Sequence, residues 1–419
     1  MLTKFLNIAD STLVNFVSNL GTKRDKALYD DFAWYAKRSV FELDNLYKTD
    51  SIAKKIINRP VQDMFRQGYY VNDLDGERLV NLYDEMARLR LNEHLMMALK
   101  LARLHGKSYV LLGVADNQEL VMPLSKGKIN LSYMTVLRAD QLIATRERLS
   151  VSEAGGFLDE PVYYQLQHDA KIASGLIHHS RVLPVVWDDG ESVLQTLYSE
   201  LLRFASVNAN VASLVHESKV DVIKTQDLMQ QIKLNSDVVL KRFNLIGLMK
   251  SNNGMLVLDK EAEEYDSKHY TFGGLPDLMR EFAIQTAGAA DMPYTILFGQ
   301  SPSGLNATGE HDLRNYYDTV AGYQNWYLRP ILDKLLAMMC GYLGLPKVTL
   351  SFAPLWQLDE KTRSDVERNN ADRDIKYLQA GIITEAQIAK QLMEEGTYTV
   401  IDESHIRLLE SLEEMPTKT

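Results

Sequence analysis

The sequence predicts an α+β fold, and two features carry that prediction. Apolar residues recur at three- and four-residue steps over long stretches, most strongly over residues 79–104 and 313–342, which is the periodicity of amphipathic helices. Between the helical stretches stand short runs rich in Val, Leu and Tyr, such as residues 108–114, which have the length and composition of strands. Helices packed on an irregular sheet give an α+β core.

The N-terminal region divides into an arm and a helical part. Residues 1–45 look like a peripheral arm, and a loosely packed terminal segment is favoured there over a dedicated binding helix. The helical pattern is firm over residues 45–66, with Thr49 or Asp50 as the N-cap. Pro60 interrupts this pattern and predicts two short helices with a bend between them.

Strand and helix signals follow each other irregularly through the middle of the chain. Strands are predicted at residues 69–71, 108–114, 133–137, 141–144, 162–166 and 183–186. Helices are predicted at residues 79–104, 193–215, 235–248 and 275–290. Shorter strand-like pieces separate the later helices, at residues 220–223, 255–259 and 270–272.

A Pro- and Gly-rich loop leads into the long helix at 313–342. Thr308 can serve as the N-cap of this helix, and Glu310 and Asp312 place negative charge in its first turn, where the free backbone N–H groups favour it. Pro330 predicts a kink, because a proline in a helix interior removes one hydrogen bond.

The same helix has an unusually aromatic face. Its members are Tyr316, Tyr317, Tyr323, Trp326 and Tyr327. Stacking on single-stranded nucleic acid needs interleaved basic residues, and only Arg314 and Arg329 are near. Packing in the core or at a subunit interface is therefore favoured.

The C-terminal part predicts a strand at 348–352 and two helices at 360–380 and 385–395. Gly381 at the end of the first helix and Thr384 as the cap of the next are typical of a helical hairpin. The tail after Leu409 is polar and predicts disorder.

Composition limits the classes of function. The chain has 419 residues, enough for two or more domains, and its single cysteine excludes an internal disulfide framework and points to a reducing cytoplasm. We expect no signal peptide and no membrane span, which needs about 20 apolar residues in a row. The net charge of −10 argues against tight, static binding of nucleic acid and suits a surface along which a duplex slides.

The sequence contains no strong catalytic constellation. It has no Cys/His cluster with zinc-ligand spacing, no His-Glu-x-x-His and no Gly-x-Ser-x-Gly, so no metal, cofactor or catalytic residue is assigned. His178 and His179 lie on a predicted strand, where adjacent side chains point to opposite faces. A structural role is favoured there over an acid–base pair.

One long and compositionally unusual string suggests a family. The chain closely resembles the portal proteins of tailed bacteriophages in the string Phe-Gly-Gln-Ser-Pro-Ser-Gly-Leu-Asn-Ala-Thr-Gly-Glu at 298–310, and in the strings at 315–318 and 324–330. The stretches at 46–57 and 377–385 agree with the resemblance in the family's order. The nearest branch is that of the short portals, once filed as phage proteins of unknown function.

The resemblance implies a ring-forming portal fold with wing, stem and small clip regions. The implied regions are an N-terminal arm at 1–45, a wing-like α+β region at 46–234, stem helices at 235–290 with a β clip at about 251–274, a tunnel loop and long helix at 291–345, and a C-terminal strand and helical hairpin with a disordered tail at 346–419. One stem helix is expected near 235–250 and the other at 275–290.

The resemblance also implies a function and partners. The chain would form the ring, by family a dodecamer, at the unique capsid vertex through which double-stranded DNA is packaged and ejected. Its partners would be the terminase large subunit, a head–tail adaptor and the major capsid or scaffold protein. It would be found in the virion and, during assembly, in the host cytoplasm, with no membrane partner and no enzymatic activity of its own.

Two sets of residues are the candidates for contact with DNA. The resemblance places the tunnel loop at Gln300, Ser301, Ser303, Gly304, Leu305, Asn306 and Thr308. Lys250 and Lys260 lie beside the expected stem and clip and are candidates for phosphate contact. Solvated surface lysines are at least as good an interpretation of these two.

Two alternatives stay open. The pattern His-x-Ser/Thr occurs at His178, His216 and His269 and resembles the doublet of two-histidine phosphoesterases. Some phage proteins join a portal-like N-terminal region to such an enzyme, which degrades cyclic-nucleotide defence signals. A cyclic-nucleotide phosphodiesterase using His216 and His269 is the first alternative, although all three matches fall inside the portal-like stretch. The second is a non-portal head adaptor.

Overall fold

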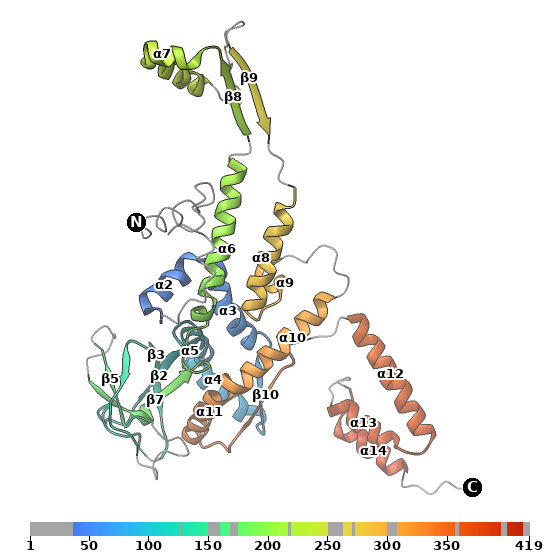
Figure 1. Cartoon of the computed structure of the whole chain (residues 1–419). Coiled ribbons are helices and arrows are strands. Elements are labelled where there is room, and N and C mark those ends of the chain that lie inside the picture. Colours follow the sequence, from blue (N-terminus) through green and yellow to red (C-terminus); the bar gives the residue numbers. More distant parts are fainter. Residues whose placement is uncertain are drawn as a thin grey trace, which may run out of the picture. The chain divides into compact units, whose positions relative to one another are not determined.

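The computed structural model contains two compact units, Met1–Ala353 and Pro354–Thr419. It describes residues 37–125, 127–149, 160–167, 175–216, 219–249, 263–269, 273–299, 308–356, 360–394 and 400–413. Helices and short antiparallel sheets are mixed in the first unit, and helices make up the described part of the second (Figure 1). This architecture confirms the α+β prediction. Most of the expected N-terminal arm, residues 1–36, lies outside the described residues.

Two helices, α2 (Val40–Thr49) and α3 (Ser51–Phe65), meet at Asp50. The Asp50 carboxylate accepts hydrogen bonds from two backbone N–H groups in the first turn of α3, at 2.7 and 2.8 Å, so it is the N-cap. The break predicted at Pro60 is wrong, because α3 continues through that residue.

Arg103 replaces the hydrogen bond that Pro60 removes. A proline has no N–H, so the carbonyl of Ile56, one turn earlier, loses its helical donor. The buried Arg103 of α5 (Leu91–His105) donates from Nη2 to that carbonyl oxygen at 2.9 Å. The helix therefore stays intact with the help of a side chain 47 positions away in the sequence.

The single helix predicted over 79–104 is instead two helices, α4 (Gly76–Arg88) and α5. They are separated at Arg90, whose backbone is left-handed with a φ of 47°. Leu89 and Leu91 are both buried. Residues two apart lie on nearly opposite sides of a helix, so a break between them allows both to enter the core.

Two three-stranded antiparallel sheets form the sheet region, in the orders β3-β2-β7 and β4-β5-β6. The strands are β2 (Lys107–Val114), β3 (Leu131–Arg138), β4 (Leu142–Ala144), β5 (Tyr163–Leu166), β6 (Leu176–His178) and β7 (Val182–Val186). The central strand β2 packs against α5, and its Tyr109 and Leu111 belong to a core cluster with residues of the second sheet. Contact on both sides explains why six consecutive residues of β2 are buried.

The long helix near 313–342 has an irregular middle. It consists of α10 (Thr308–Tyr323), a π-helical turn labelled η3 (Gln324–Leu328), and α11 (Arg329–Leu343). The irregularity lies directly before Pro330, the position of the predicted kink, and the N–H of Arg329 bonds to the carbonyl of Gln324, five residues back. The widened turn accommodates a residue that cannot donate.

A two-stranded sheet joins an early and a late segment of the first unit. Strand β10 (Thr349–Phe352) pairs antiparallel with β1 (Tyr69–Asn72). Both strands were predicted, but their pairing was not, because nothing local in the sequence relates segments so far apart.

The later helices of the first unit enclose an insertion. Helix α6 (Val193–His216) packs beside α8 (Leu275–Ala289), as Figure 1 shows. Between them in the chain come β8 (Lys219–Thr225), α7 (Leu228–Met249) and β9 (Glu263–His269).

The partner of α8 therefore differs from the expected one. It is α6, and not the segment 235–250, which falls in α7. The reason is that β8 and β9 pair along their whole length, from Lys219 with His269 to Thr225 with Glu263. This pairing makes the whole stretch 219–269 the insertion. The strand-like pieces predicted at 255–259 and 270–272 lie outside the described residues.

The second unit contains α12 (Glu360–Gln379), α13 (Glu385–Glu394) and α14 (Glu403–Glu413). Thr384 caps α13: its hydroxyl accepts the Gln387 N–H at 3.3 Å, and its own N–H donates to the Gln387 side chain at 3.1 Å. Helix α14 continues past Leu409, where the sequence predicts disorder, because it packs against α13 and buries Ile406. Residues 414–419 lie outside the described residues.

The link between Pro60 and Arg103 can be tested with a double-mutant cycle. Arg103→Met should lower the free energy of unfolding by about 1–3 kcal/mol, because the buried Ile56 carbonyl loses its donor. In a Pro60→Ala background the loss should be smaller, since residue 60 then offers an N–H to that carbonyl. Urea unfolding of the four proteins, followed by tryptophan fluorescence, measures the difference. Equal losses in both backgrounds would contradict the link.

Candidate functional site

An aromatic cluster joins the long helix to the sheet region. The buried Trp187, directly after β7, stacks on Tyr327 with ring centroids 4.1 Å apart and meets the edge of Tyr323 at 4.9 Å. The Arg103 guanidinium lies 4.4 Å from the Trp187 ring centroid. These contacts agree with the prediction that the aromatic face packs in the core or at a subunit interface. Trp326 is the exception, because it is 69% exposed.

A second contact fixes the start of the long helix against α3. The Tyr316 hydroxyl donates to the buried Asp63 carboxylate at 2.9 Å, and Arg59 pairs with the same carboxylate at 2.8 Å. Burial, reinforced by the charge of Asp63, raises the pKa of Tyr316, so it remains a donor. Nearby, Arg66 donates to the Tyr317 hydroxyl at 2.7 Å.

Burial also lowers the pKa of the Arg103 guanidinium, and the neighbouring Tyr323 opposes this shift. Arginine nevertheless stays charged in proteins, so this side chain is a buried cation. Its position was not singled out from the sequence, although a signal existed. Arg103 stands one helical turn after Leu99 and two after Leu95, which puts a charge at the edge of the apolar stripe of α5.

The residues predicted to contact DNA are mostly not described. Gln300, Ser301, Ser303, Gly304, Leu305 and Asn306 lie outside the described residues, and so do Lys250 and Lys260. Thr308 is the first residue of α10, so it is not the N-cap of the helix as drawn. The segment 300–307 connects α9 (Tyr294–Phe298) to α10, and Lys55 anchors α9 by donating to the Leu297 carbonyl at 2.8 Å.

A cavity of about 360 Å³ lies among α8, α9 and α10. Asp291 and Asp312 are among its lining residues, and the lining contains no Lys, Arg or His. A phosphate would find no cationic partner there. This part of the described protein favours repulsion of a nucleic acid over its capture.

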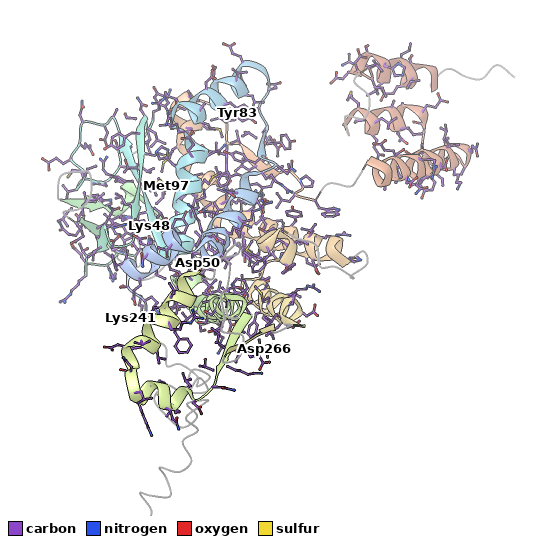
Figure 2. All side chains as sticks on the ribbon, turned by 90° about the horizontal axis from the view of Figure 1, so that it is seen from above. Lys48, Asp50, Tyr83, Met97, Lys241 and Asp266 are labelled. Carbon is purple, nitrogen blue, oxygen red and sulfur yellow. The ribbon has the colours of Figure 1, made fainter. Side chains whose placement is uncertain are left out.

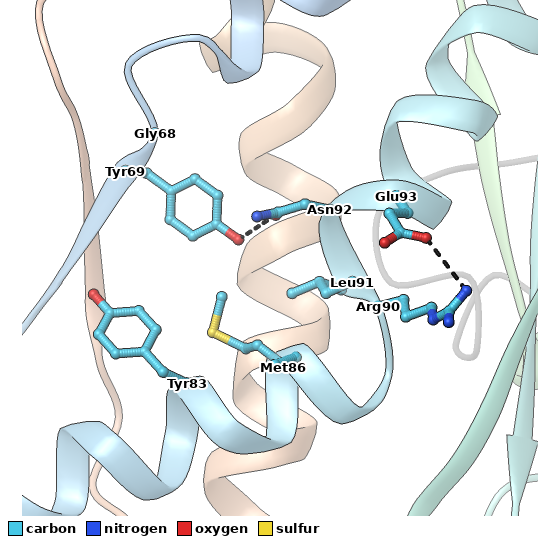
Figure 3. A pocket seen from close by; sticks show the side chains of 9 residues that line it. Gly68, Tyr69, Tyr83, Met86, Arg90, Leu91, Asn92 and Glu93 are labelled. Atoms are coloured by element: carbon cyan, nitrogen blue, oxygen red, sulfur yellow. Dashed lines mark hydrogen bonds and ion pairs between the residues drawn. The ribbon is translucent and has the colours of Figure 1, made fainter.

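A larger cavity of about 420 Å³ lies where β1, α4 and α5 meet, and Figure 3 shows it. Its lining includes the aromatic rings of Tyr69 and Tyr83, the thioether of Met86 and the aliphatic side chain of Leu91. The Tyr69 hydroxyl donates to Asn92 at 2.7 Å, and burial raises the pKa of Tyr69. We call this space the β1–α4–α5 cavity.

The prediction that the side chains of His178 and His179 point to opposite faces of a strand is wrong. Strand β6 ends at His178 and a 3₁₀ turn, η2 (His179–Arg181), begins, so strand alternation no longer applies. The two imidazole rings lie with centroids 4.5 Å apart.

The groups around these histidines have structural partners. The Ser180 hydroxyl accepts the Leu124 N–H at 2.9 Å, and Arg181 donates to Asp116 at 2.6 Å and to the Met122 carbonyl at 2.7 Å. These bonds hold the chain at 116–124 against η2. The structural role predicted for this stretch agrees with the observed contacts.

The backbones of His216 and His269, the histidines of the other two His-x-Ser/Thr matches, lie near each other. His216 is the last residue of α6, and His269 is the last residue of β9 and pairs with Lys219, three residues after His216. Ser218 and Thr271 lie outside the described residues.

Within the part of the chain that is described, no group of three or more His, Cys, Asp or Glu residues could hold a metal ion. A search of the same residues finds no helix with the length and apolarity required to cross a membrane.

The fold is shared with chains of solved gene transfer agent structures. A chain from the neck of an empty gene transfer agent particle, computed with C6 symmetry, has a TM-score of 0.52 and 15% identity over 86% of this chain and 94% of that one. A chain from the virion of a native gene transfer agent particle has a TM-score of 0.50. It is 15% identical over 86% of this chain and 94% of that one.

The chain belongs to the phage portal protein family, whose model matches residues 41–376. This match confirms the resemblance noted in the sequence. An uncharacterized protein of Haemophilus influenzae is 32% identical over 98% of this chain and 95% of its own length.

Two further relatives carry the name anti-CBASS protein Acb1. The one from a Caulobacter species is 31% identical over 87% of this chain and 62% of its own length. The one from Sphingomonas paeninsulae is 30% identical over 93% of this chain and 66% of its own length. The chain thus spans less than two thirds of each of these two relatives.

The ion pair of Asp116 with Arg181 predicts a pH dependence. The hydrogen bond from Arg181 lowers the pKa of Asp116. The folded pKa is thus below the unfolded value of about 4, so the pair stabilises the fold above that pH and loses its effect as the pH falls through the folded pKa. Asp116→Asn should lower the melting temperature at pH 7 by about 2–4 °C.

The difference from wild type should shrink as the pH falls from 4 to 2, which thermal melts across that range would measure. Asp365→Asn is the matched control, because Asp365 pairs at 2.9 Å with Arg368 on an exposed helix. A deficit for Asp116→Asn that is constant with pH would argue against the pair.

Proposed function

We propose that this chain is a portal subunit, which forms a ring at one vertex of a phage capsid and passes double-stranded DNA through it. The family match over residues 41–376 carries this proposal. The fold shared with a chain of a gene transfer agent neck supports it. The virion, and the host cytoplasm during assembly, would be its locations.

Helices α6 and α8 are the proposed stem, and the insertion 219–269 the proposed clip. Their packing against each other supports this assignment, as does the β8–β9 pairing that closes the insertion. The sheets and α3–α5 would form the wing, and the second unit a crown-like region. The N-terminal arm is retained as proposed from the sequence.

The DNA would meet the tunnel loop at Gln300–Thr308, which lies between α9 and α10. The acidic cavity among α8, α9 and α10 and the net charge of −10 support a channel that lets a duplex slide. Lys250 and Lys260 remain proposed phosphate contacts in the clip. The terminase large subunit, a head–tail adaptor and the capsid or scaffold protein are the proposed partners.

Ring formation is the first test of this function. The purified chain should give a species near twelve times 47.7 kDa in mass photometry, because identical head-to-tail contacts close when the subunit rotation closes. Negative-stain images should show end-on rings with a hole of at least about 20 Å, the width implied by B-DNA groove dimensions. A head adaptor would form rings only on an added portal. Rings that appear only then would contradict the proposal.

A second candidate function is a cyclic-nucleotide phosphodiesterase. The junction that brings His216 and His269 together in the backbone favours it, as do the relatives named anti-CBASS protein Acb1. The portal proposal is preferred, because those relatives extend well beyond the matched region and the chain spans less than two thirds of each.

An activity assay separates the two candidates. On the portal proposal, purified wild-type protein hydrolyses no cyclic dinucleotide, and His269→Ala assembles as wild type does. His405→Ala is the control, since His405 lies exposed on α14. Hydrolysis by wild type and by His405→Ala that is lost in His269→Ala would favour the enzyme.

A further inference from the structure

We propose that, in the ring, Phe41 of one subunit inserts into the β1–α4–α5 cavity of its neighbour. This inference rests on the proposed ring. It assigns one residue and one cavity to the contact between copies, and it follows from the chemistry of the two surfaces and from their places in the fold.

The cavity suits an aromatic ring. Its wall contains two tyrosine rings, Tyr69 and Tyr83, and the thioether of Met86, with the buried Leu91 behind them (Figure 3). Aromatic rings pack favourably edge to face on one another and against sulfur. A phenyl ring entering this cavity would meet both kinds of partner.

Phe41 is a ring without cover. It lies in the first turn of α2 and is 79% exposed, the largest exposed fraction of any aromatic side chain among the described residues. Phenylalanine has no polar atom with which to bind water, so exposing it costs free energy unless a partner covers it. A second copy of the chain would supply that cover.

The charges beside the two surfaces complement each other. Phe41 is flanked by Arg38 and Glu42, which pair at 3.7 Å. The cavity is flanked by Arg90 and Glu93, which also pair at 3.7 Å and are each 72% exposed. Arg38 also lies 3.9 Å from the Tyr198 ring centroid, and Glu42 also accepts hydrogen bonds from Ser39 in the capping box of α2. These contacts would stay in place on docking, with Glu42 facing Arg90 and Arg38 facing Glu93. Such rim pairs set orientation more than affinity.

The two surfaces lie at opposite ends of α5, as a head-to-tail contact requires. Asp44 ties α2 to the C-terminal end of α5 through His105, with 3.1 Å between Oδ1 and Nε2. The cavity is at the N-terminal end, about 20 Å away at 1.5 Å per residue. In Figure 2, Met97 of α5 lies between Tyr83, at the cavity, and Lys48 of α2.

Among the described residues of the first unit, Trp326 and Tyr70 are the other aromatic rings that are more than 60% exposed, and both are less suitable. Tyr70 belongs to β1, the strand that forms a wall of the cavity itself. Arg329, one turn after Trp326, donates to the Leu350 carbonyl of β10 at 2.9 Å. Strand β10 pairs with β1, which forms a wall of the cavity. Trp326 is therefore tied to the same side of the unit as the cavity.

Disulfide cross-linking tests the contact directly. In the double variant Phe41→Cys/Tyr83→Cys, oxidation should join neighbours into a ladder of multimers on a non-reducing gel. The two positions are too far apart within one subunit to bond to each other. The native Cys340 is buried. The pair Phe41→Cys/Met97→Cys is the control, because Met97 is exposed on α5 outside the cavity, and it should give no ladder.

A second variant measures the strength of the contact. Phe41→Ala should raise the protein concentration at half-assembly at least tenfold and leave the melting temperature of the monomer unchanged. Trp326→Ala removes an exposed ring of comparable size and should change neither.

The outcomes separate this inference from the proposed function. Wild-type rings with no ladder, or with Phe41→Ala assembling as wild type, overturn the inference alone. A wild-type protein that forms no ring under any assembly condition overturns both.

Discussion

The buried guanidinium of Arg103 connects the main elements of the first unit. It donates to the Ile56 carbonyl of α3 and faces the ring of Trp187, on which Tyr327 of the π-helical turn stacks. A buried cation is costly where its donors and charge are unmet, and Nε of Arg103 has no hydrogen-bond partner among the described residues. The elements that do contact this guanidinium must therefore stay in place together. Helices from both ends of the unit and the end of a strand are thereby held around one side chain.

The two strands of the insertion have less support than the elements around Arg103. Strands β8 and β9 form a sheet of their own, and a two-stranded sheet has marginal stability alone. Packing of α6 against α8 supports its base. In the proposed ring, contacts with neighbouring copies can bury further surface of this insertion. Such contacts would add the stability that the two-stranded sheet lacks alone.

The charges of the described residues agree with the proposed conduit more than with a phosphate-binding site. The cavity among α8, α9 and α10 is lined by Asp291 and Asp312 and by no basic residue. Arg103 and Arg181, the buried basic residues of the described part, bind carbonyls and a carboxylate of the protein itself. Cations used in this way are not available to hold phosphates. The proposed contact between copies relies instead on an aromatic ring and on rim charges of both signs.

The sequence by itself determined the features whose interacting residues lie within one or two helical turns of each other. The Asp50 and Thr384 caps, the irregularity before Pro330 and the helix at 193–215 each depend on neighbours one or two turns away, and the family was visible in the string at 298–310. Only the tertiary structure decided the rest. The helix passes Pro60 because Arg103, 47 positions away, supplies the donor, and α8 packs with α6 because β8 pairs with β9 across the insertion. Residues so far apart in the sequence come into contact only in the folded chain. The local periodicity of apolar residues therefore does not predict these contacts.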